Sequence, residues 1–515
     1  MKSLGLSLVL LCFVALGGCA TGNRGERGEI CSADGNHSHA IHGKSLEKNK
    51  FGFGTEALIG VVDLDLAMLV DIALENNPAT KRSWHLARLA RAQVGQANST
   101  FFPTVTLGGQ IARSESNAAS SGAARQETLA TTFHPSLEIH YSLFQFGAGK
   151  AVAEAAKQAL CAANCQYDRT IQGVIHGVQR AYFALCSAES TVASNEHNLN
   201  DAAAAYEAAF MRHQSGLVSI QEYLQAKANK SQAEFELEQS CAGVETARAA
   251  LAKAVGIKVS RAIRVLPPAI ATNAADMDRA MDGIMGNIAR KCPGAAAAYA
   301  NVSATLRISN PAEVADMDRA IDDFLGKIVC LRPDVAAAGA NVRAREHLSR
   351  STRAKMLPEF IIGGSGNVKK YSHRSDSFNN FNLFAGITWK IFDGLKNFYD
   401  IAEVRENLEI ARQELRAAKL SAQTEIWTNY FAFKSANKQL QAARILEQSA
   451  GEAFEATGIA FANGLCKFTD LVSAQTCLAN ARRQRVVSEN NLLTSLADLA
   501  YSVGGVADFD LTKNR

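Results

Sequence analysis

The sequence predicts an α+β protein in which very long helices alternate with pairs of amphipathic strands, and three observations support this. Apolar residues make up 47% of the 515 residues but aromatic residues only 7%, a bias that favours long helices. No proline lies between Pro135 and Pro267 or after Pro358, so helices can run far beyond the globular average. "GLVSIQEYLQA" at Gly216 returns as "GLCKFTDLVSA" at Gly464, which indicates an internal two-fold repeat.

The N-terminus predicts export. "MKSLGLSLVLLCFVALGGCA" has one basic residue, an apolar run and then small residues, as in a secretory signal peptide of residues 1–18. "LGGC" places Cys19 where bacterial lipoproteins carry their lipidated cysteine, although an ordinary signal cleaved nearby is an alternative. Residues 19–57 would then form a lipidated tether. One lipid group only tethers a chain weakly, so we expect further membrane contacts.

The first repeat is predicted at 58–265. It opens with helix that is interrupted at Asn-Asn-Pro and ends near Pro103. A β-hairpin follows at 102–144, with strands of about ten residues that each have one apolar and one polar face, as membrane barrels require. A half-buried soluble hairpin would look similar. A long helix pair at 150–255, broken at Gly216, predicts an antiparallel coiled-coil hairpin of about 60–90 Å.

The same order then recurs. The second repeat, 310–505, has a helix, a β-hairpin at 358–392 and a long helix pair at 397–503. Between the repeats, 266–309 forms a linker with an extra tandem copy, because "ADMDRAMDG" and "ADMDRAIDD" lie 40 residues apart. Residues 506–515 form a C-terminal tail.

Several functional classes are disfavoured. The net charge of +4 is mild, and no basic stripe with interleaved aromatics suggests a nucleic-acid binder. No phosphate loop, zinc-protease motif or nucleophile elbow is present, so we expect neither an enzyme nor a cofactor. The nine cysteines after Cys19 have no disulfide-framework spacing. Cys161 and Cys165 are interpreted as small core residues rather than metal ligands, and no metal site is predicted.

Four strands cannot form a membrane barrel alone. A barrel must close to satisfy its backbone, and the smallest single-chain barrels use about eight strands. The strands therefore form either a soluble sheet or part of a barrel to which several chains contribute. Three chains would supply twelve strands.

Several segments together resemble the TolC-type outer-membrane efflux proteins, in the lipoprotein branch that serves RND-type multidrug pumps. They are "ALENNPATKRSWHLARLARAQVGQANSTFFPTVTLGG", "LFQFGAGKAVAEAAKQAL", "SGLVSIQEYLQAKANKSQAEFELEQS", "IFDGLKN" and "NGLCKFTDLVSAQTCLANARRQ". The resemblance implies a homotrimer, with a twelve-stranded transmembrane β-barrel in the bacterial outer membrane. An α-helical coiled-coil tunnel would cross the periplasm and dock on a periplasmic adaptor and an inner-membrane transporter of RND or ABC type.

In that case the protein would be the passive exit channel of a tripartite efflux pump. Three alternatives stay open. One is the outer-membrane channel of a type I protein secretion system, which has the same architecture. The others are a periplasmic adaptor, which the duplicated helix and strand order disfavours, and a lipid-tethered structural coiled coil. The transported substrate is not encoded in any motif.

The resemblance also assigns the turns. Gly216 and Gly464 would lie at the periplasmic tip, where glycine suits the left-handed residue that ends a helix. Ser219 and Glu222 have capping-box spacing. Lys467 stands where Ser219 stands in the first copy, so the second cap is predicted to be weaker, with Thr469 as an alternative cap.

The gate residues follow from the same resemblance. Asp470 matches the first acid of the rings that narrow the tunnel, and Ser473 occupies the next acid position. Cys466, beside Lys467, matches a tip-locking arginine, and Glu222 matches an acid that helps to hold the tip shut. The alternative for both acids is favourable charge at a helix N-terminus.

Overall fold

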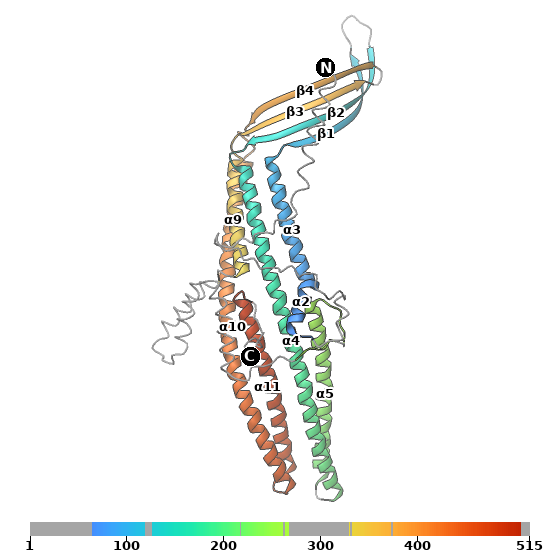
Figure 1. Ribbon diagram of the computed structural model, residues 1–515, viewed down its shortest axis with the longest axis vertical. Coiled ribbons are helices and arrows are strands. Elements are labelled where there is room, and N and C mark those ends of the chain that lie inside the picture. The colour runs from blue at the N-terminus through green and yellow to red at the C-terminus, as the bar shows by residue number, and fades with distance from the viewer. Residues whose placement is uncertain are drawn as a thin grey trace, which may run out of the picture. The chain divides into compact units, whose positions relative to one another are not determined.

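A computed structural model describes residues 64–118, 126–216, 218–260, 263–266, 329, 332–371 and 374–505 (Figure 1). The chain divides into two compact units, Met1–Phe51 and Gly52–Arg515, and every described residue belongs to the second. The predicted signal peptide, Cys19, the predicted tether, the tandem copy and the C-terminal tail all lie outside the described residues.

The Asn-Asn-Pro sequence forms a junction between two helices, α2 (Leu66–Asn76) and α3 (Pro78–Asn98). The Asn77 side chain caps α3, accepting a 2.8 Å hydrogen bond from the Ala79 N–H, and Pro78 occupies the first helical position, which needs no N–H donor. The Asn77 amide also donates to the Ala254 carbonyl at 2.7 Å. The break thereby ties α2 and α3 to a helix far along the chain. A single 3₁₀ turn, η2 (Ser99–Phe101), leads to the first strand.

The four strands form one antiparallel sheet in the order β1-β2-β3-β4. Their bounds are β1 Thr104–Ala118, β2 Gln126–Phe144, β3 Glu359–Tyr371 and β4 Arg374–Thr388. They contain 13 to 19 residues, so the expected length of about ten was wrong. Backbone pairing continues past the residues that alternate in polarity, because ladder hydrogen bonds do not depend on side-chain type.

The register places apolar side chains of all four strands on one face. Two neighbouring rows across the sheet are Val105–Ile139–Gly364–Leu383 and Leu107–Leu137–Gly366–Phe381. Leu107, Phe381 and Leu383 are exposed, so no described residue covers this face. The intervening row on the opposite face is Thr106–Glu138–Ser365–Asn382. β1 and β4 pair on one side only.

The remaining helices form two long antiparallel hairpins and one shorter helix. They are α4 (Ala148–Gln214), α5 (Ile220–Val255), α9 (Pro333–Ala354), α10 (Lys396–Ala462) and α11 (Phe468–Ser502). α4 and α10 each contain 67 residues and are therefore about 100 Å long at about 1.5 Å per residue, longer than expected. α4 packs against α5, α10 against α11, and α9 and α11 both lie against α4 (Figure 1).

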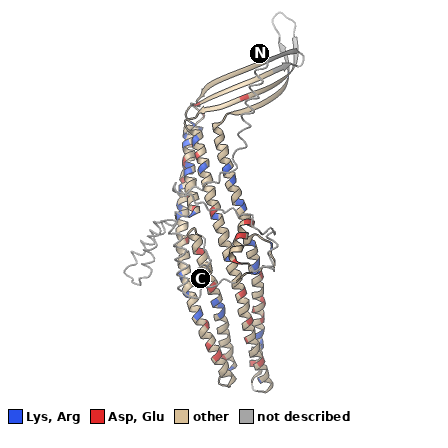
Figure 2. Ribbon diagram, in the orientation of Figure 1, with Lys and Arg blue, Asp and Glu red and all other residues tan. Residues whose placement is uncertain are grey.

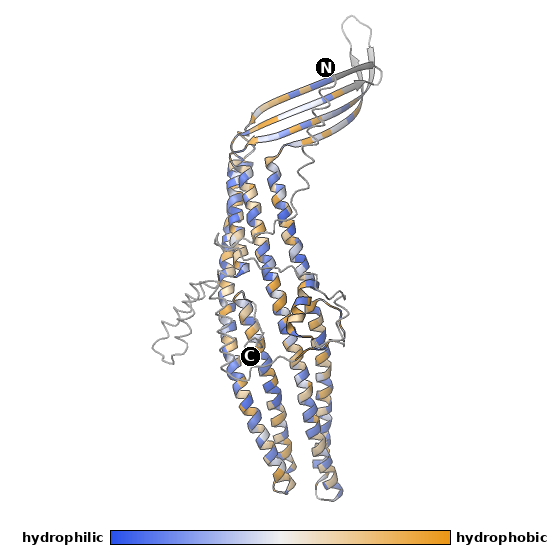
Figure 3. Cartoon of the chain, in the orientation of Figure 1, coloured by the Kyte–Doolittle hydropathy of each residue, from blue (hydrophilic) through white to orange (hydrophobic). Residues whose placement is uncertain are grey.

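Apolar and polar residues are interspersed along every helix (Figure 3). Within the part of the chain that is described, no helix combines the length and the apolar character needed to cross a membrane.

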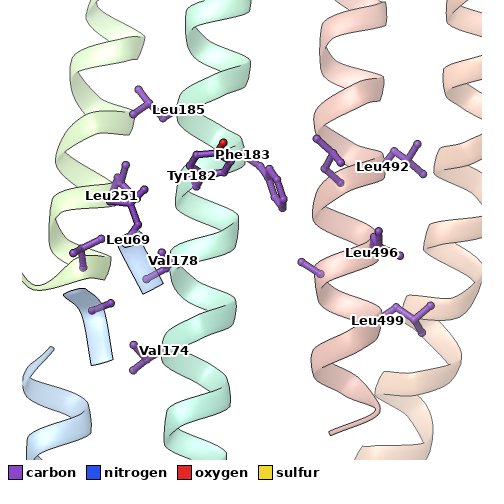
Figure 4. Close-up of a cluster of buried hydrophobic side chains, with 14 of the residues drawn as sticks. Leu69, Val174, Val178, Tyr182, Phe183, Leu185, Leu251, Leu492, Leu496 and Leu499 are labelled. Atoms are coloured by element: carbon purple, nitrogen blue, oxygen red, sulfur yellow. The ribbon is translucent and has the colours of Figure 1, made fainter. Parts of the chain in front are cut away.

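The main core lies where α4 meets α2, α5 and α11. Tyr182, Phe183 and Leu185 of α4 are fully buried, as are Leu251 of α5 and Leu492 of α11 (Figure 4). A smaller cluster packs Cys161 and Cys165 of α4 against Ala337 and Ala340 of α9. The two cysteines are therefore small core residues, as the sequence predicted.

A buried ion cluster joins α4, α9 and α10. Arg332, of which only 3% is exposed, donates to Asp334 at 2.7 Å and to Glu425 at 2.6 Å. Arg169 lies 3.9 Å from Asp334 and 3.8 Å from Glu425. Burial by itself would raise the pKa of Asp334, but hydrogen bonds and charge from Arg332, with the charge of Arg169, outweigh it and lower the pKa.

The same two arginines cap the end of α11. Arg169 donates to the Tyr501 carbonyl at 2.9 Å, and its guanidinium lies 3.6 Å from the centre of the Tyr501 ring. Arg332 donates to the Ser502 carbonyl at 2.8 Å. The last carbonyls of a helix lack intrahelical partners and carry its negative dipole end, so this end of α11 is firmly held.

Candidate functional site

The two helical hairpins turn at residues 212–222 and 461–471, which we call the first tip and the second tip. At the first tip, Gly216 has φ +71°, and its N–H donates to the His213 carbonyl at 2.9 Å. The Ser219 hydroxyl then caps α5 by accepting from the Glu222 N–H at 3.3 Å. Glycine is suited to this turn because an L side chain would be strained at that φ.

The second tip closes with a pair of backbone hydrogen bonds. Gly464 has φ +72° and donates to the Phe461 carbonyl at 3.1 Å, while the Leu465 N–H donates to the Ala460 carbonyl at 2.8 Å. This pair of bonds is the Schellman motif that closes a helix C-terminus. The sulfur of Cys466 lies 3.6 Å from the Thr457 carbonyl oxygen, so the thiol also turns back onto α10.

α11 begins at Phe468 with Lys467 as its cap residue, at the position that matches Ser219. The alternative cap, Thr469, lies inside the helix. A lysine side chain has no acceptor atom, but the Asp470 carboxylate accepts from the Lys467 N–H at 3.1 Å. The second tip therefore uses the acid half of a capping box, and the first tip uses the hydroxyl half. The missing serine is compensated by Asp470.

A contact that the sequence pattern does not predict joins the two tips. Arg212, in the last turn of α4, donates to the carbonyls of Phe461 at 3.1 Å and Ala462 at 3.3 Å. Its guanidinium also lies 4.2 Å from the centre of the Phe461 ring. A cation from the first hairpin thus caps the C-terminal end of α10, where the helix dipole favours positive charge.

Apolar side chains from both hairpins pack beneath this contact. The cluster contains Ala209 and Ala226 from the first hairpin and Phe461, Phe468 and Leu471 from the second. Because alanine stands at both first-hairpin positions, the two hairpins can approach closely. Association of the tips within one chain therefore combines apolar burial with the Arg212 contact.

The other residues assigned by resemblance lie around this contact. Asp470 and Ser473 are exposed in the first turns of α11, and Lys467 is exposed before it. Glu222 is half-buried in the first turn of α5. Cys466 is half-buried and packs against the tip cluster, without the charge that an ionic lock requires. Within one chain, the hydrogen-bonding cation between the tips is Arg212.

Two further arginines link the hairpins above the tips. Arg482 of α11 donates to Asp201 of α4 at 3.0 Å and to Asn198 at 3.1 Å. Arg483 donates to Glu236 of α5 at 2.9 Å. Sequence patterns could not have found these pairs, because each partner is a polar residue of a type that any amphipathic helix carries. Figure 2 shows both charge signs along the lower parts of the hairpins.

The described residues contain no group of three or more His, Cys, Asp or Glu side chains placed to hold a metal ion. The arrangement holds two long hairpins together through helix capping, apolar packing and ion pairs, and it ends in a sheet with one uncovered apolar face. Such features are typical of one class of protein, the membrane channel.

Comparison with known proteins identifies the family. Residues 69–257 and 325–505 match the outer membrane efflux protein family, and the match covers more than two thirds of the chain. The chain therefore belongs to this family, whose members are outer-membrane channels rather than enzymes.

Individual relatives are more distant. "Protein CyaE" of Bordetella pertussis is 26% identical over 243 residues, which are 47% of this chain and 50% of CyaE. The chain thus matches about half the length of this curated relative. A membrane protein from Pseudomonas aeruginosa is 20% identical, with a TM-score of 0.70 over 86% of this chain and 93% of the other. The Campylobacter jejuni CmeC outer membrane channel is 18% identical, also with a TM-score of 0.70, over 87% and 88%. The structures show a shared fold.

Proposed function

We propose that three copies of this chain form the passive exit channel of a tripartite efflux pump. Their sheets would close a twelve-stranded barrel in the outer membrane, and their helical hairpins would form the periplasmic tunnel. A periplasmic adaptor and an inner-membrane transporter would complete the pump, and a lipid on Cys19 would add an anchor. The observation that carries this proposal is the uncovered apolar face of a sheet whose two edges have no partner among the described residues.

The dimensions of the sheet support a membrane location. Apolar side chains recur on one face of β2 from Phe133 to Leu143, a span of eleven residues. At about 3.3 Å per residue this span is about 35 Å long, and a strand tilt of about 45° reduces its height to about 25 Å. That height equals the apolar band of an outer-membrane barrel.

The edges support assembly. β1 and β4 are 15 residues each and pair on one side only, and a long uncovered edge is a template for pairing with another chain. In a bilayer every backbone group needs a partner, which requires closure. Four strands are too few, whereas pairing β4 of one copy with β1 of the next closes a ring of three copies.

At the tips, we assign the gate to the second hairpin. Asp470 is exposed, and in a ring of three copies its carboxylates would create a cation-selective constriction. Ser473, one turn further along, would add a polar but uncharged ring. Glu222 and Lys467 would flank the constriction, and Arg212 would hold the second tip against the first in the closed state.

The proposal is tested with the purified full-length protein. Native mass spectrometry in detergent should give three times the chain mass, and planar bilayers should show discrete conducting channels. A monomer with no conductance would sink the proposal. In cells, photocrosslinkers placed at the exposed Gln221 of the first tip should capture the adaptor. The transporter recovered with it, RND-type or ABC-type, decides between drug efflux and type I protein secretion.

A further inference from the structure

A stretch of exposed apolar residues lies where β4 gives way to α10. Within residues 389–399, which we call the junction segment, six large apolar side chains are each between 57% and 82% exposed. They are Trp389, Ile391, Phe392, Leu395, Phe398 and Tyr399. Such a concentration on a protein surface marks an interaction site.

The junction segment continues the apolar face of the sheet. Side chains at odd positions of β4, from Phe381 to Ile387, lie in the apolar rows. Trp389 and Ile391 follow at the same alternation beyond the last paired residue, Thr388. The Trp389 indole N–H donates to the Met356 carbonyl at 3.1 Å, which joins the junction segment to the connection that leads into β3. A surface continuous with the proposed lipid-facing band is expected to meet the same bilayer.

Two apolar residues at the corners between sheet and helix have a strained backbone conformation. Leu395 has φ +69°, and Phe146, in the equivalent corner between β2 and α4, has φ +50°. A non-glycine residue in this conformation costs free energy, and a glycine beside each of them, Gly394 and Gly147, already has positive φ. Phe146 packs against the rings of Phe144 and Phe360, yet Phe146 and Leu395 both remain exposed. A strained backbone that presents exposed apolar side chains suggests a partner beyond the described residues.

Cations are interleaved with these apolar residues. Lys390 and Lys396 are exposed in the junction segment, and Arg353 and Lys355 are exposed at the end of α9 nearby. Among the described residues none of the four lies within ion-pair distance of a carboxylate, although the charge of Lys390 interacts favourably with the Glu359 carboxylate. Two neighbouring carboxylates have other hydrogen-bond donors, since Asp393 accepts from the Asn397 N–H at 3.1 Å and Glu359 accepts from Ser142 and Gln145. Exposed cations beside aromatic residues match the headgroup region of a bilayer.

We propose that the junction segment is a phospholipid-binding collar with a preference for anionic headgroups. Trp389, Ile391 and Phe392 contact acyl chains, and Lys390 and Lys396 bind the headgroup phosphates. The partner is a phospholipid of the periplasmic leaflet, because the junction segment lies at the end of the strands from which the long helices continue. This inference rests on the proposed function, since it needs the sheet to lie in a membrane.

The test uses Trp389 as its reporter. The chain has three tryptophans, so the full-length variant Trp84→Phe with Trp427→Phe keeps fluorescence at the junction segment alone. It is reconstituted into phosphatidylcholine bilayers whose acyl chains carry bromine, a contact quencher, and then into bilayers in which only added phosphatidylglycerol is brominated. We expect quenching in the first case. In the second, we expect an association constant for phosphatidylglycerol at least threefold that for phosphatidylcholine.

Lysine variants separate binding of the headgroup from mere contact of Trp389 with the acyl chains. Lys390→Gln with Lys396→Gln should bring the phosphatidylglycerol preference close to one and leave quenching by brominated phosphatidylcholine intact. The matched control is Lys434→Gln with Lys438→Gln, two exposed positions further along α10, which should retain the preference.

The outcomes distinguish the collar from the channel. Two results overturn the collar. One is quenching of Trp389 with no preference for phosphatidylglycerol in the reporter variant that keeps both lysines. The other is a phosphatidylglycerol preference that survives the Lys390 and Lys396 substitutions. Channels that conduct while Trp389 is not quenched by any lipid also overturn it, because another copy then covers the junction segment. Loss of both conductance and quenching instead rejects the proposed channel.

Discussion

At the residue scale, single polar contacts hold the hairpin tips together. Arg212 stands in a stretch of α4 that any amphipathic helix could contain, yet its guanidinium completes the C-terminus of α10. The position is favourable because three effects coincide: hydrogen bonds to carbonyls, the helix dipole and the face of the Phe461 ring. A residue of this kind stabilises the closed arrangement of the tips without any partner of opposite formal charge.

Arg212→Met should therefore loosen the tips. The methionine keeps most of the aliphatic stem but removes the donors, at a cost of about 1 kcal/mol for a half-exposed charged contact. In planar bilayers the variant should conduct more, or open more often, than the parent protein. Lys227→Met, at an exposed cation of α5, serves as the control. Equal conductance of the parent protein and the two variants would show that Arg212 does not stabilise the closed state.

Asp168 of α4 provides a pH-dependent prediction. Burial raises its pKa from 3.8 to about 6, so the folded protein binds this proton more tightly than the unfolded chain does. The protonated Asp168 carboxyl therefore contributes to the stability of the fold. This contribution is fully present below about pH 4, is lost as the pH rises to about 6, and stays lost above that value. Asp168→Asn should raise the free energy of unfolding at pH 7.5 by about 1–2 kcal/mol.

The measurement is the midpoint of thermal unfolding in detergent, followed by circular dichroism at pH 7.5 and near pH 4. The midpoint of Asp168→Asn should exceed that of the parent at pH 7.5 and match it near pH 4. A gain of the same size at both values would assign the effect to packing rather than to ionisation.

At the element scale, the same position in two hairpins is stabilised by different chemistry. α5 is capped by the Ser219 hydroxyl, and α11 by the Asp470 carboxylate, which reaches back to the cap residue. Either half of a capping box satisfies one of the free N–H groups of the first turn. Asp470 therefore has a structural role in addition to the proposed one, and substitutions there must preserve the acceptor.

At Gly363 the sheet has no room for a side chain. A Cβ atom on Gly363 of β3 would lie 2.4 Å from the ring of Phe384 in β4. Gly363→Val should therefore displace Phe384 and destabilise the sheet by about 1–3 kcal/mol, which lowers the amount of assembled protein in membranes. Adding Phe384→Ala should restore it.

Gly109→Val in β1 is the matched control, because nothing lies within 4 Å of a Cβ atom there. If both glycine variants lose assembly to the same degree, the cause is strand flexibility and not the Phe384 ring.

At the scale of the whole molecule, the proposed selectivity exists only in the assembly. One exposed Asp470 is an ordinary helix-capping acid, whereas three at a constriction would attract cations. Asp470→Asn should reduce block of the channel by divalent cations and leave the trimer mass unchanged, since the amide oxygen still caps α11. Asp470→Ala should also lower thermal stability. Unchanged block in Asp470→Asn, measured in planar bilayers, would leave Asp470 with the capping role alone.

Much of the fold could be predicted from the sequence, because it depends on local physics. The prolines and glycines set the breaks at Pro78, Gly216 and Gly464, and helical periodicity indicated the long helices between them. Alternating polarity located both strand pairs. Strand length was wrong, because hydrogen bonding in the ladder extends beyond the alternating residues. The cap of α11 lies at Lys467, as the match to Ser219 indicated, but the pattern did not show that the Asp470 side chain accepts from the Lys467 N–H.

The sequence by itself therefore determined the order of the elements, their breaks and the apolar face of each strand, since these follow from neighbouring residues. Only the tertiary structure decided which distant residues meet. Arg212 contacts a carbonyl 249 positions away, Arg169 and Arg332 converge on the end of α11, and the sheet register aligns the apolar rows of both halves. Such contacts depend on how long helices and strands pack, and a pattern along the chain does not contain that information.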